Sequence, residues 1–193
     1  MATFDRGFKS RAELTSLTVR RELDLAPTDP LDPKKLASFL DVKLLTPDDV
    51  PGLPENVRDQ LLYKDPGGWS AVGMLVDGQG LVIYNPKTSL GRRASDIAHE
   101  LGHFILDHEP SRIILSLDGS IAMRSFDQKQ EDEANWLAWC LLLPREALIA
   151  AKRARLSADE IANHYGVSKQ LVTFRLGVSG VDLQFKRRCP RRA

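Results

Sequence analysis

The sequence predicts an α+β fold for this chain of 193 residues. Two runs rich in β-branched and apolar residues, 70–76 and 81–85, flank four turn residues and predict a β-hairpin. From Arg92 onward, apolar residues recur every three or four positions, a spacing typical of amphipathic helices. Strands in one part of the chain and helices in another are the pattern of a small sheet covered by helices.

Before the hairpin, the sequence predicts a helix over residues 10–25 with Ser10 as its cap, a short helix over 33–40 and a strand over 42–45. The prolines of segment 26–33 separate the two helices. Proline lacks the N–H that a helix needs and disfavours helical backbone at the residue before it.

After the hairpin, the sequence predicts an amphipathic helix that begins near Arg92 and ends near His108. A loop with one strand follows, and then a second amphipathic helix, which Pro144 stops. The polar start of this second helix is expected at 128–133. Further helices are expected at 145–153, 158–164 and 169–176.

The composition excludes several classes of protein. Hydrophobic residues make up 42% of the chain and charged residues 27%, as in ordinary globular proteins and unlike disordered, collagen-like or coiled-coil sequences. The length allows one compact domain, or one domain with a small appendage. No apolar run approaches the roughly 18 residues that cross a membrane, and the N-terminus lacks the apolar segment of a signal peptide, so we expect a soluble cytoplasmic protein.

The charge is distributed unevenly. The formal net charge is +1, but residues 152–193 carry ten Lys and Arg against three Asp and Glu, a net charge of +7. An anionic partner would therefore bind at the C-terminal end. Cys140 lies in an apolar run and Cys189 in a basic tail, which fits neither a disulfide framework nor a thiolate zinc site.

The first amphipathic helix contains the sequence HELGH, with imidazoles at His99 and His103. Residues four apart lie about 40° apart around a helix and roughly 6 Å apart along it, so both rings can reach one ion while Glu100 projects to the side of the same face. An open catalytic zinc site takes three protein ligands and a water, so a third ligand must come from another element. The alternative is that the two histidines only occupy the polar face of a helix.

The second amphipathic helix begins with three acids that offer this third ligand. Glu131 shares a helix face with Asn135, whose amide oxygen could accept the second N–H of a ligating histidine. Glu133 lies about 200° around the helix from Glu131 and has no such group one turn on. We favour Glu131 as the ligand, with Glu133 as the alternative. Acids that only stabilise the N-terminal turn through the helix dipole would explain Asp132.

The segments ASDIAHELGHFILDH and EDEANWLAWCLLLP resemble the ImmA/IrrE family of metallo-endopeptidases. In that family an H-E-L-[GA]-H helix is paired with an E-x-x-A-N-x-F-A-x-x-L-L-x-P helix. This chain departs from the pattern at Trp136-Leu137, where the family has a residue followed by Phe. The resemblance is looser upstream, through the hairpin, and downstream to about Val178.

The resemblance implies a zincin-like, gluzincin-like metallopeptidase core, in which a small mixed or antiparallel sheet packs on the HEXXH helix. It implies that His99, His103 and Glu131 bind Zn²⁺ and that Glu100 is the general base and acid of amide hydrolysis. An open edge of the hairpin would let an extended peptide add as another strand. The substrate implied by the resemblance is an Xre-type helix-turn-helix repressor, cleaved to derepress stress, phage or mobile-element genes.

The residue that stabilises the oxyanion stays open. Tyr84, His108 and His164 are candidates by chemical type alone. On a continuous helix His108 would lie about 140° around from His103, which favours a place on the surface or behind a ligand over ligation itself.

Residues 157–176 resemble a helix-turn-helix, with a capping box at the start of the first helix and Gly166 in the turn. The same pattern closes many helical domains that do not touch DNA. The side chains that the second helix would offer to DNA are Lys169, Gln170, Thr173 and Arg175.

We therefore divide the chain into a metallopeptidase domain with an N-terminal helical segment (1–153), a helix-turn-helix-like subdomain (154–180) and a basic, unstructured tail (181–193). Two other functions stay open on this evidence. One is a DNA-binding transcriptional regulator that keeps the metallopeptidase fold as a scaffold. The other is a toxin–antitoxin or signalling protein that acts by binding alone.

Overall fold

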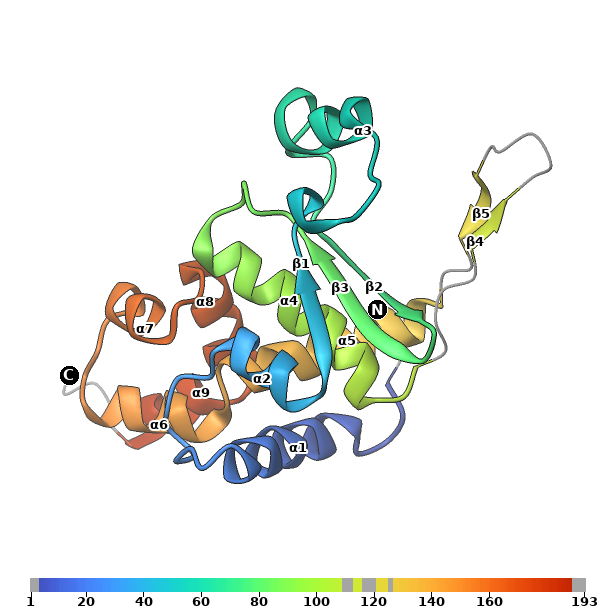
Figure 1. Cartoon of the computed structure of the whole chain (residues 1–193). Helices are drawn as coiled ribbons and strands as arrows, with labels where there is room; N and C mark the ends of the chain where they lie inside the picture. Colours follow the sequence, from blue (N-terminus) through green and yellow to red (C-terminus); the bar gives the residue numbers. More distant parts are fainter. Residues whose placement is uncertain (1–3, 109–112, 116–120, 125–126, 189–193) are drawn as a thin grey trace.

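The structure is a computed structural model, and it describes residues 4–108, 113–115, 121–124 and 127–188 (Figure 1). Cys189 therefore lies outside the described residues. The α+β fold predicted from the sequence is confirmed. The helices are α1 (Phe8–Glu22), α2 (Pro33–Phe39), α3 (Glu55–Asp59), α4 (Leu90–Ile105), α5 (Gln128–Leu142), α6 (Arg145–Arg153), α7 (Ala158–Tyr165), α8 (Lys169–Val178) and α9 (Val181–Arg188). The strands are β1 (Val42–Leu45), β2 (Ala71–Val76), β3 (Gln79–Tyr84), β4 (Ile113–Leu115) and β5 (Ile121–Arg124).

The main sheet has three strands in the order β1-β3-β2. Strand β1 runs parallel to β3, and β2 runs antiparallel to it, with Gly73 opposite Val82. The predicted hairpin is confirmed, but its turn is shorter than expected. Only Asp77 and Gly78 connect the strands, and both have positive φ angles, as the tight turns of two-residue hairpins require. Strands β4 and β5 form a second hairpin, where the sequence predicted one strand.

Helix α4 packs against β2 and β3, α5 packs against α4, and α1 packs against α5 (Figure 1). The core has two parts. One joins the sheet to α1, α2, α4 and α5, and the other joins α4 and α5 to the C-terminal helices. Helix α5 contributes to both, which is consistent with its apolar surface reaching around most of the helix.

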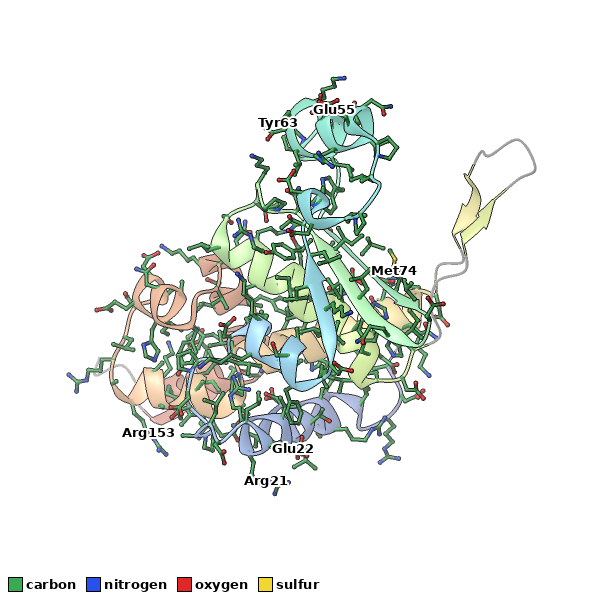
Figure 2. The ribbon with its side chains drawn as sticks, in the orientation of Figure 1. Arg21, Glu22, Glu55, Tyr63, Met74 and Arg153 are labelled. Atoms are coloured by element: carbon green, nitrogen blue, oxygen red, sulfur yellow. The ribbon has the colours of Figure 1, made fainter. Side chains whose placement is uncertain are left out.

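The segment with α3 stands away from the sheet and carries the exposed side chain of Tyr63 (Figure 2). No helix was predicted from the sequence at Glu55–Asp59. A single π-helical turn, Gln60–Lys64, follows α3 directly. No helix in the described part of the chain is both long and apolar enough to cross a bilayer.

Several helix ends differ from the sequence-based prediction, and two of them have a clear cause in the backbone. Helix α1 begins at Phe8 after Gly7, whose φ of 83° marks the boundary, so Ser10 lies inside the helix and is not its cap. Helix α4 ends at Ile105, about one turn earlier than expected, because Asp107 adopts a left-handed conformation with φ of 52°.

The expectation of an unstructured tail from residue 181 is wrong for Val181–Arg188, which form α9. Val181 is fully buried in the C-terminal part of the core, and Phe185 packs against the same cluster one turn later. Polar contacts add to this anchoring. Asp182 pairs with Lys152 of α6 at 2.8 Å, and Gln184 accepts a hydrogen bond from Arg145 at 2.8 Å. Residues 189–193 lie outside the described part.

The helices of the predicted helix-turn-helix are present as α7 and α8. The capping box of Ser157 with Glu160 has formed, and Gly166 ends α7 in the left-handed conformation with φ of 63°. Buried residues of both helices, among them Ile161 and Val172, lie in one apolar cluster with residues of α4 and α5. These helices thus share a core with the helices that carry the HEXXH and acidic motifs. The domain boundary at residue 154 stays a prediction.

The C-terminal end of α5 is held by side chains from distant parts of the chain. The Ser16 hydroxyl donates to the Cys140 carbonyl at 2.7 Å, and the guanidinium of Arg20 donates to the Leu141 carbonyl at 2.6 Å. The last carbonyls of a helix have no partners within it, and positive charge there also favours the helix dipole. Burial lowers the pKa of Arg20 to about 10, which leaves it protonated at neutral pH.

Arg175 of α8 completes this arrangement. Its Nε donates to the carbonyl of Leu143 at 3.0 Å, and its Nη2 lies 2.6 Å from a carboxylate oxygen of Glu13 on α1. The Arg175 side chain has no exposed surface. The prediction that Arg175 contacts DNA is therefore wrong, because this cation ties α8 to α1 and to the end of α5.

We predict that Arg175→Met lowers the free energy of unfolding by about 3 kcal/mol, because it leaves the Leu143 carbonyl without its donor and the half-buried Glu13 carboxylate without its cation, with only the N–H of Arg145 still bonded to it. Urea denaturation followed by circular dichroism measures this. Lys169→Met on the same helix is the matched control, since Lys169 pairs with Asp159 at the surface and should change the midpoint little. Equal midpoints for the two variants would contradict the structural role of Arg175.

Candidate metal centre

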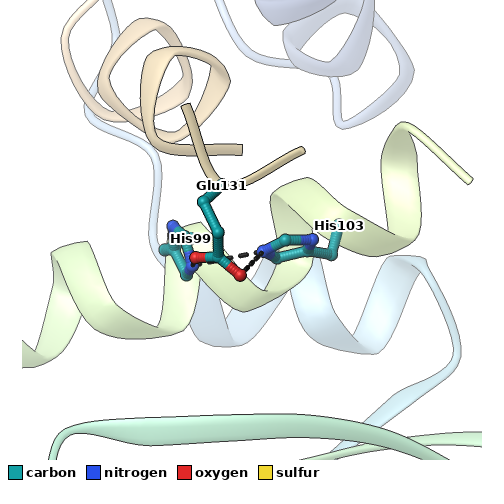
Figure 3. Close-up of side chains that lie close together, drawn as sticks. All are labelled: His99, His103 and Glu131. Carbon is teal, nitrogen blue, oxygen red and sulfur yellow. Dashed lines mark hydrogen bonds and ion pairs between the residues drawn. The ribbon is translucent and has the colours of Figure 1, made fainter. Parts of the chain in front are cut away.

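Three side chains from two helices converge beside the sheet. His99 and His103 project from α4, and Glu131 reaches them from the first turn of α5 (Figure 3). The Nε2 atoms of the two histidines lie 3.2 Å apart. The Glu131 carboxylate lies 3.2 Å from Nε2 of His99 and 3.7 Å from Nε2 of His103.

These distances fit a shared metal ion. Ligand atoms about 2.0–2.1 Å from a tetrahedral zinc ion lie about 3.3 Å from one another. The three side chains are each about one-fifth exposed, so solvent or a substrate can reach the point between them. Two imidazoles and one carboxylate are also a donor set of catalytic zinc sites, which keep the fourth position open. The group is therefore compatible with a metal site.

The close crossing of α4 and α5 brings Glu131 within reach. Gly102 of α4 faces the backbone of Ala134 in α5, and a Cβ atom at Gly102 would lie only 3.0 Å from the Ala134 carbonyl oxygen. A side chain at position 102 would push the helices apart. Because Glu131 precedes Ala134 by about one turn, such a shift would carry its carboxylate away from both histidines.

Glu100 points from α4 toward the sheet. Its carboxylate accepts a hydrogen bond of 2.8 Å from the backbone N–H of Gly73 in β2. A Cβ at position 73 would lie 2.8 Å from the same carboxylate oxygen, so a side chain there would displace this carboxylate. This role of Gly73 was not predicted from the sequence, although an isolated glycine within a strand pattern indicates close approach of a neighbour.

His108 lies next to His103, on the side away from His99 and Glu131. The angle of about 140° expected between His103 and His108 assumed a continuous helix, and α4 ends before His108. The chain leaves α4 after Ile105 and turns back, so the Nδ1 atoms of His103 and His108 lie 3.0 Å apart. Nε2 of His108 faces the Glu133 carboxylate at 3.5 Å. Burial lowers the pKa of His108, and the nearby Glu133 opposes that shift.

The two acids considered as third ligand thus have different neighbours. Glu131 faces His99 and His103, whereas Glu133 faces His108. Among the described residues, the three potential ligands that come together are the ones expected from the sequence.

The hydrogen bond expected from Asn135 is not seen at His99. The Nδ1 atom of His99 is buried and has no hydrogen-bond partner among the described residues. The supporting role of Asn135 stays a prediction.

Two candidates for stabilising an oxyanion have other surroundings. The ring of Tyr84 lies 6.0 Å from the Arg93 guanidinium, near the start of α4. His164 is exposed on α7, with its ring 4.7 Å from that of Tyr165.

The remaining candidates for DNA contact are exposed on α8. Lys169 forms a surface ion pair with Asp159 at 2.8 Å, and the Thr173 hydroxyl donates to the carbonyl of Lys169. Gln170 is exposed beside them. DNA contact through Lys169, Gln170 and Thr173 stays a prediction.

Comparison with known proteins gives a family and a structural likeness. The sequence profile of a peptidase family, M78, described as the IrrE N-terminal-like domain, matches residues 60–177. Among solved structures, a Mycobacterium tuberculosis transcriptional regulator is similar over 90% of this chain, with 17% sequence identity and a TM-score of 0.49. The match takes in 48% of that regulator, so this chain spans about half its length. A search of curated proteins finds no match.

The profile matches more than half of the chain and takes in β2, β3, α4 and α5, which carry the three converging donors and Glu100. This chain belongs to the ImmA/IrrE family of metallopeptidases, defined by the IrrE N-terminal-like domain.

Proposed function

We propose that this chain is a zinc-dependent endopeptidase that cleaves an Xre-type transcriptional repressor in the cytoplasm and so derepresses stress, phage or mobile-element genes. The observation that carries the catalytic part is the convergence of His99, His103 and Glu131, with Glu100 on the same helix as the two histidines. Membership of a metallopeptidase family supports hydrolysis. The identity of the substrate rests on the family resemblance alone.

In this proposal His99, His103 and Glu131 hold the zinc ion. When bound, the ion polarises the scissile carbonyl and makes a water molecule nucleophilic near neutral pH. The carboxylate also contributes a negative charge, so the protein site is complementary to a divalent cation.

Glu100 transfers the proton from the attacking water to the leaving group. Its carboxylate takes a proton from the attacking water and then gives this proton to the amide nitrogen that leaves, so that one acid serves as base and acid in turn. The hydrogen bond from Gly73 supports this assignment, because it fixes the direction of the carboxylate.

The substrate would bind along β2. This strand pairs with β3 on one side and forms the outer strand of the three-stranded sheet. The hydrogen bond from Asn85 N–H to the Ser70 carbonyl means that residue 70 faces β3, so the backbone groups of Ala71, Gly73 and Leu75 face outward. An extended peptide could pair with the outward groups of Ala71 and Leu75 and bring its backbone past Glu100, which already accepts the Gly73 N–H.

Glu100→Gln should lower the rate of cleavage of an Xre-type repressor by roughly 10²-fold or more, because glutamine cannot exchange the proton. Zinc binding should remain, since the three ligands are unchanged. Gel analysis of repressor fragments, with zinc content measured on the same samples, tests both points.

The same experiment separates the other functions. A DNA-binding regulator would keep its activity in Glu100→Gln, and a protein that acts by binding alone would need its partner but no metal. Failure of the zinc-loaded wild type to cleave the repressor, or cleavage that survives chelation of zinc, would contradict the proposed function.

Glu131→Gln should weaken zinc binding by more than the roughly 10- to 100-fold typical of groups that only support a ligand, because it removes a charged donor. Competition with a chromophoric chelator measures the affinity. Asp132→Asn is the matched control, an acid-to-amide change at the next residue, whose side chain accepts a hydrogen bond from Gln128. Equal affinity in the two variants would exclude Glu131 as a ligand.

Gly73→Ala should lower kcat by about 10²-fold while zinc affinity stays at the wild-type value, because the added methyl group displaces the Glu100 carboxylate and leaves the ligands in place. Gly177→Ala is a suitable control, since nothing lies within 4 Å of a Cβ at that position. Unchanged turnover in Gly73→Ala would show that the contact with β2 does not position Glu100.

A further inference from the structure

A row of three side chains extends from the candidate metal centre into the protein. Nδ1 of His103 lies 3.0 Å from Nδ1 of His108, and Nε2 of His108 lies 3.5 Å from the Glu133 carboxylate. The side chains of His108 and Glu133 are 7% and 12% exposed, so water competes little for these contacts. We propose that His108, oriented by Glu133, is a positioning residue that holds the His103 ring in the tautomer and direction needed for metal binding.

The backbone explains why His108 reaches His103. After Leu106, the last residue of the cap, the N–H of Asp107 bonds to the Phe104 carbonyl and the N–H of His108 bonds to the His103 carbonyl. This pair of bonds around a left-handed residue is a Schellman motif, which reverses the chain at a helix end. Aspartate is among the few residues other than glycine that adopt this conformation readily. His103 and His108 are therefore joined by a backbone hydrogen bond, and the same turn places their imidazoles side by side.

The donors and acceptors of the row are consistent in only one direction. The Glu133 carboxylate can only accept, so the Nε2 of His108 that faces it carries the hydrogen. In a neutral imidazole the other nitrogen is then an acceptor, so Nδ1 of His108 accepts the N–H at Nδ1 of His103. His103 is left with its lone pair on Nε2, the atom that faces His99 and Glu131. Glu133 thus sets the tautomer of His103 through His108.

His103 has such a supporting group at its second ring nitrogen, whereas His99 has none among the described residues. Nδ1 of His99 is buried without a hydrogen-bond partner among the described residues. Groups that hold the second nitrogen of a ligating histidine fix its tautomer and raise its basicity, and their loss typically weakens metal affinity by 10- to 100-fold. We therefore expect the Glu133–His108 pair to contribute to metal affinity through His103.

The proposal rests on the proposed zinc site, and the test separates the two. Zinc affinity is measured by chelator competition for the wild type, His108→Phe and His108→Asn, and visible spectra are recorded for the Co²⁺ forms. His108→Phe removes the acceptor and should weaken zinc binding by about 10- to 100-fold and change the Co²⁺ spectrum. His108→Asn keeps an oxygen near the position of Nδ1 and should recover most of the affinity, which a purely structural role of the imidazole would not predict.

Glu133→Gln supplies a second measurement that does not depend on the folding of His108→Phe, and the thermal unfolding of each metal-free protein is recorded alongside. Glu133→Gln should weaken zinc binding in the wild-type background and have no further effect in His108→Asn, because asparagine does not reach Glu133. Wild-type zinc affinity and Co²⁺ spectrum in both His108→Phe and Glu133→Gln would overturn the positioning role. A wild type that binds no zinc would instead overturn the proposed function.

Discussion

The close crossing of α4 and α5 is the constraint on which the candidate metal centre depends. The Ala134 backbone lies against Gly102, where no side chain separates the helices. This approach brings Glu131 to 3.2 Å from His99, a separation that suits two ligands of one ion. The two histidines lie on one helix and need only its regular geometry. The third donor needs the packing of two helices, so the fold contributes to the site chiefly by fixing this one crossing.

Helix α5 can hold that position because both of its ends are anchored. At its start, Asp127 accepts hydrogen bonds from the first backbone N–H groups. At its end, Arg20 and Arg175 donate to carbonyls that the helix itself leaves unpaired. Arginine suits this place, since several donors in a planar group can serve carbonyl and carboxylate acceptors together. Helices α1 and α8, which lie outside the candidate site, thus contribute to the placement of Glu131.

Much of the fold could be predicted because it depends on local patterns. The hairpin, β1 and the helices α4 to α8 follow from apolar periodicity, turn residues and proline, and the HELGH spacing alone brings His99 and His103 together. The predictions were wrong where a single backbone angle or a residue distant in the sequence determines the structure. Asp107 ends α4 because it adopts a left-handed conformation that many residues disfavour. Arg175 was predicted to be exposed because its partner Glu13 is 162 residues away in the sequence. Apolar periodicity predicts neither the backbone conformation of Asp107 nor the ion pair of Arg175.

The environment of Glu100 links the sheet to the proposed chemistry. Glu100 accepts a hydrogen bond from the Gly73 N–H, which faces the outer edge of β2, where a substrate strand would pair. While this bond persists, an added strand can pair with the outward groups of Ala71 and Leu75 and with the Gly73 carbonyl, but not with the Gly73 N–H. A peptide bound in this way would have one unpaired position directly opposite Glu100. Pairing on either side of that position would then fix the register of the peptide, and the residue opposite Glu100 would be the one whose backbone is free to react.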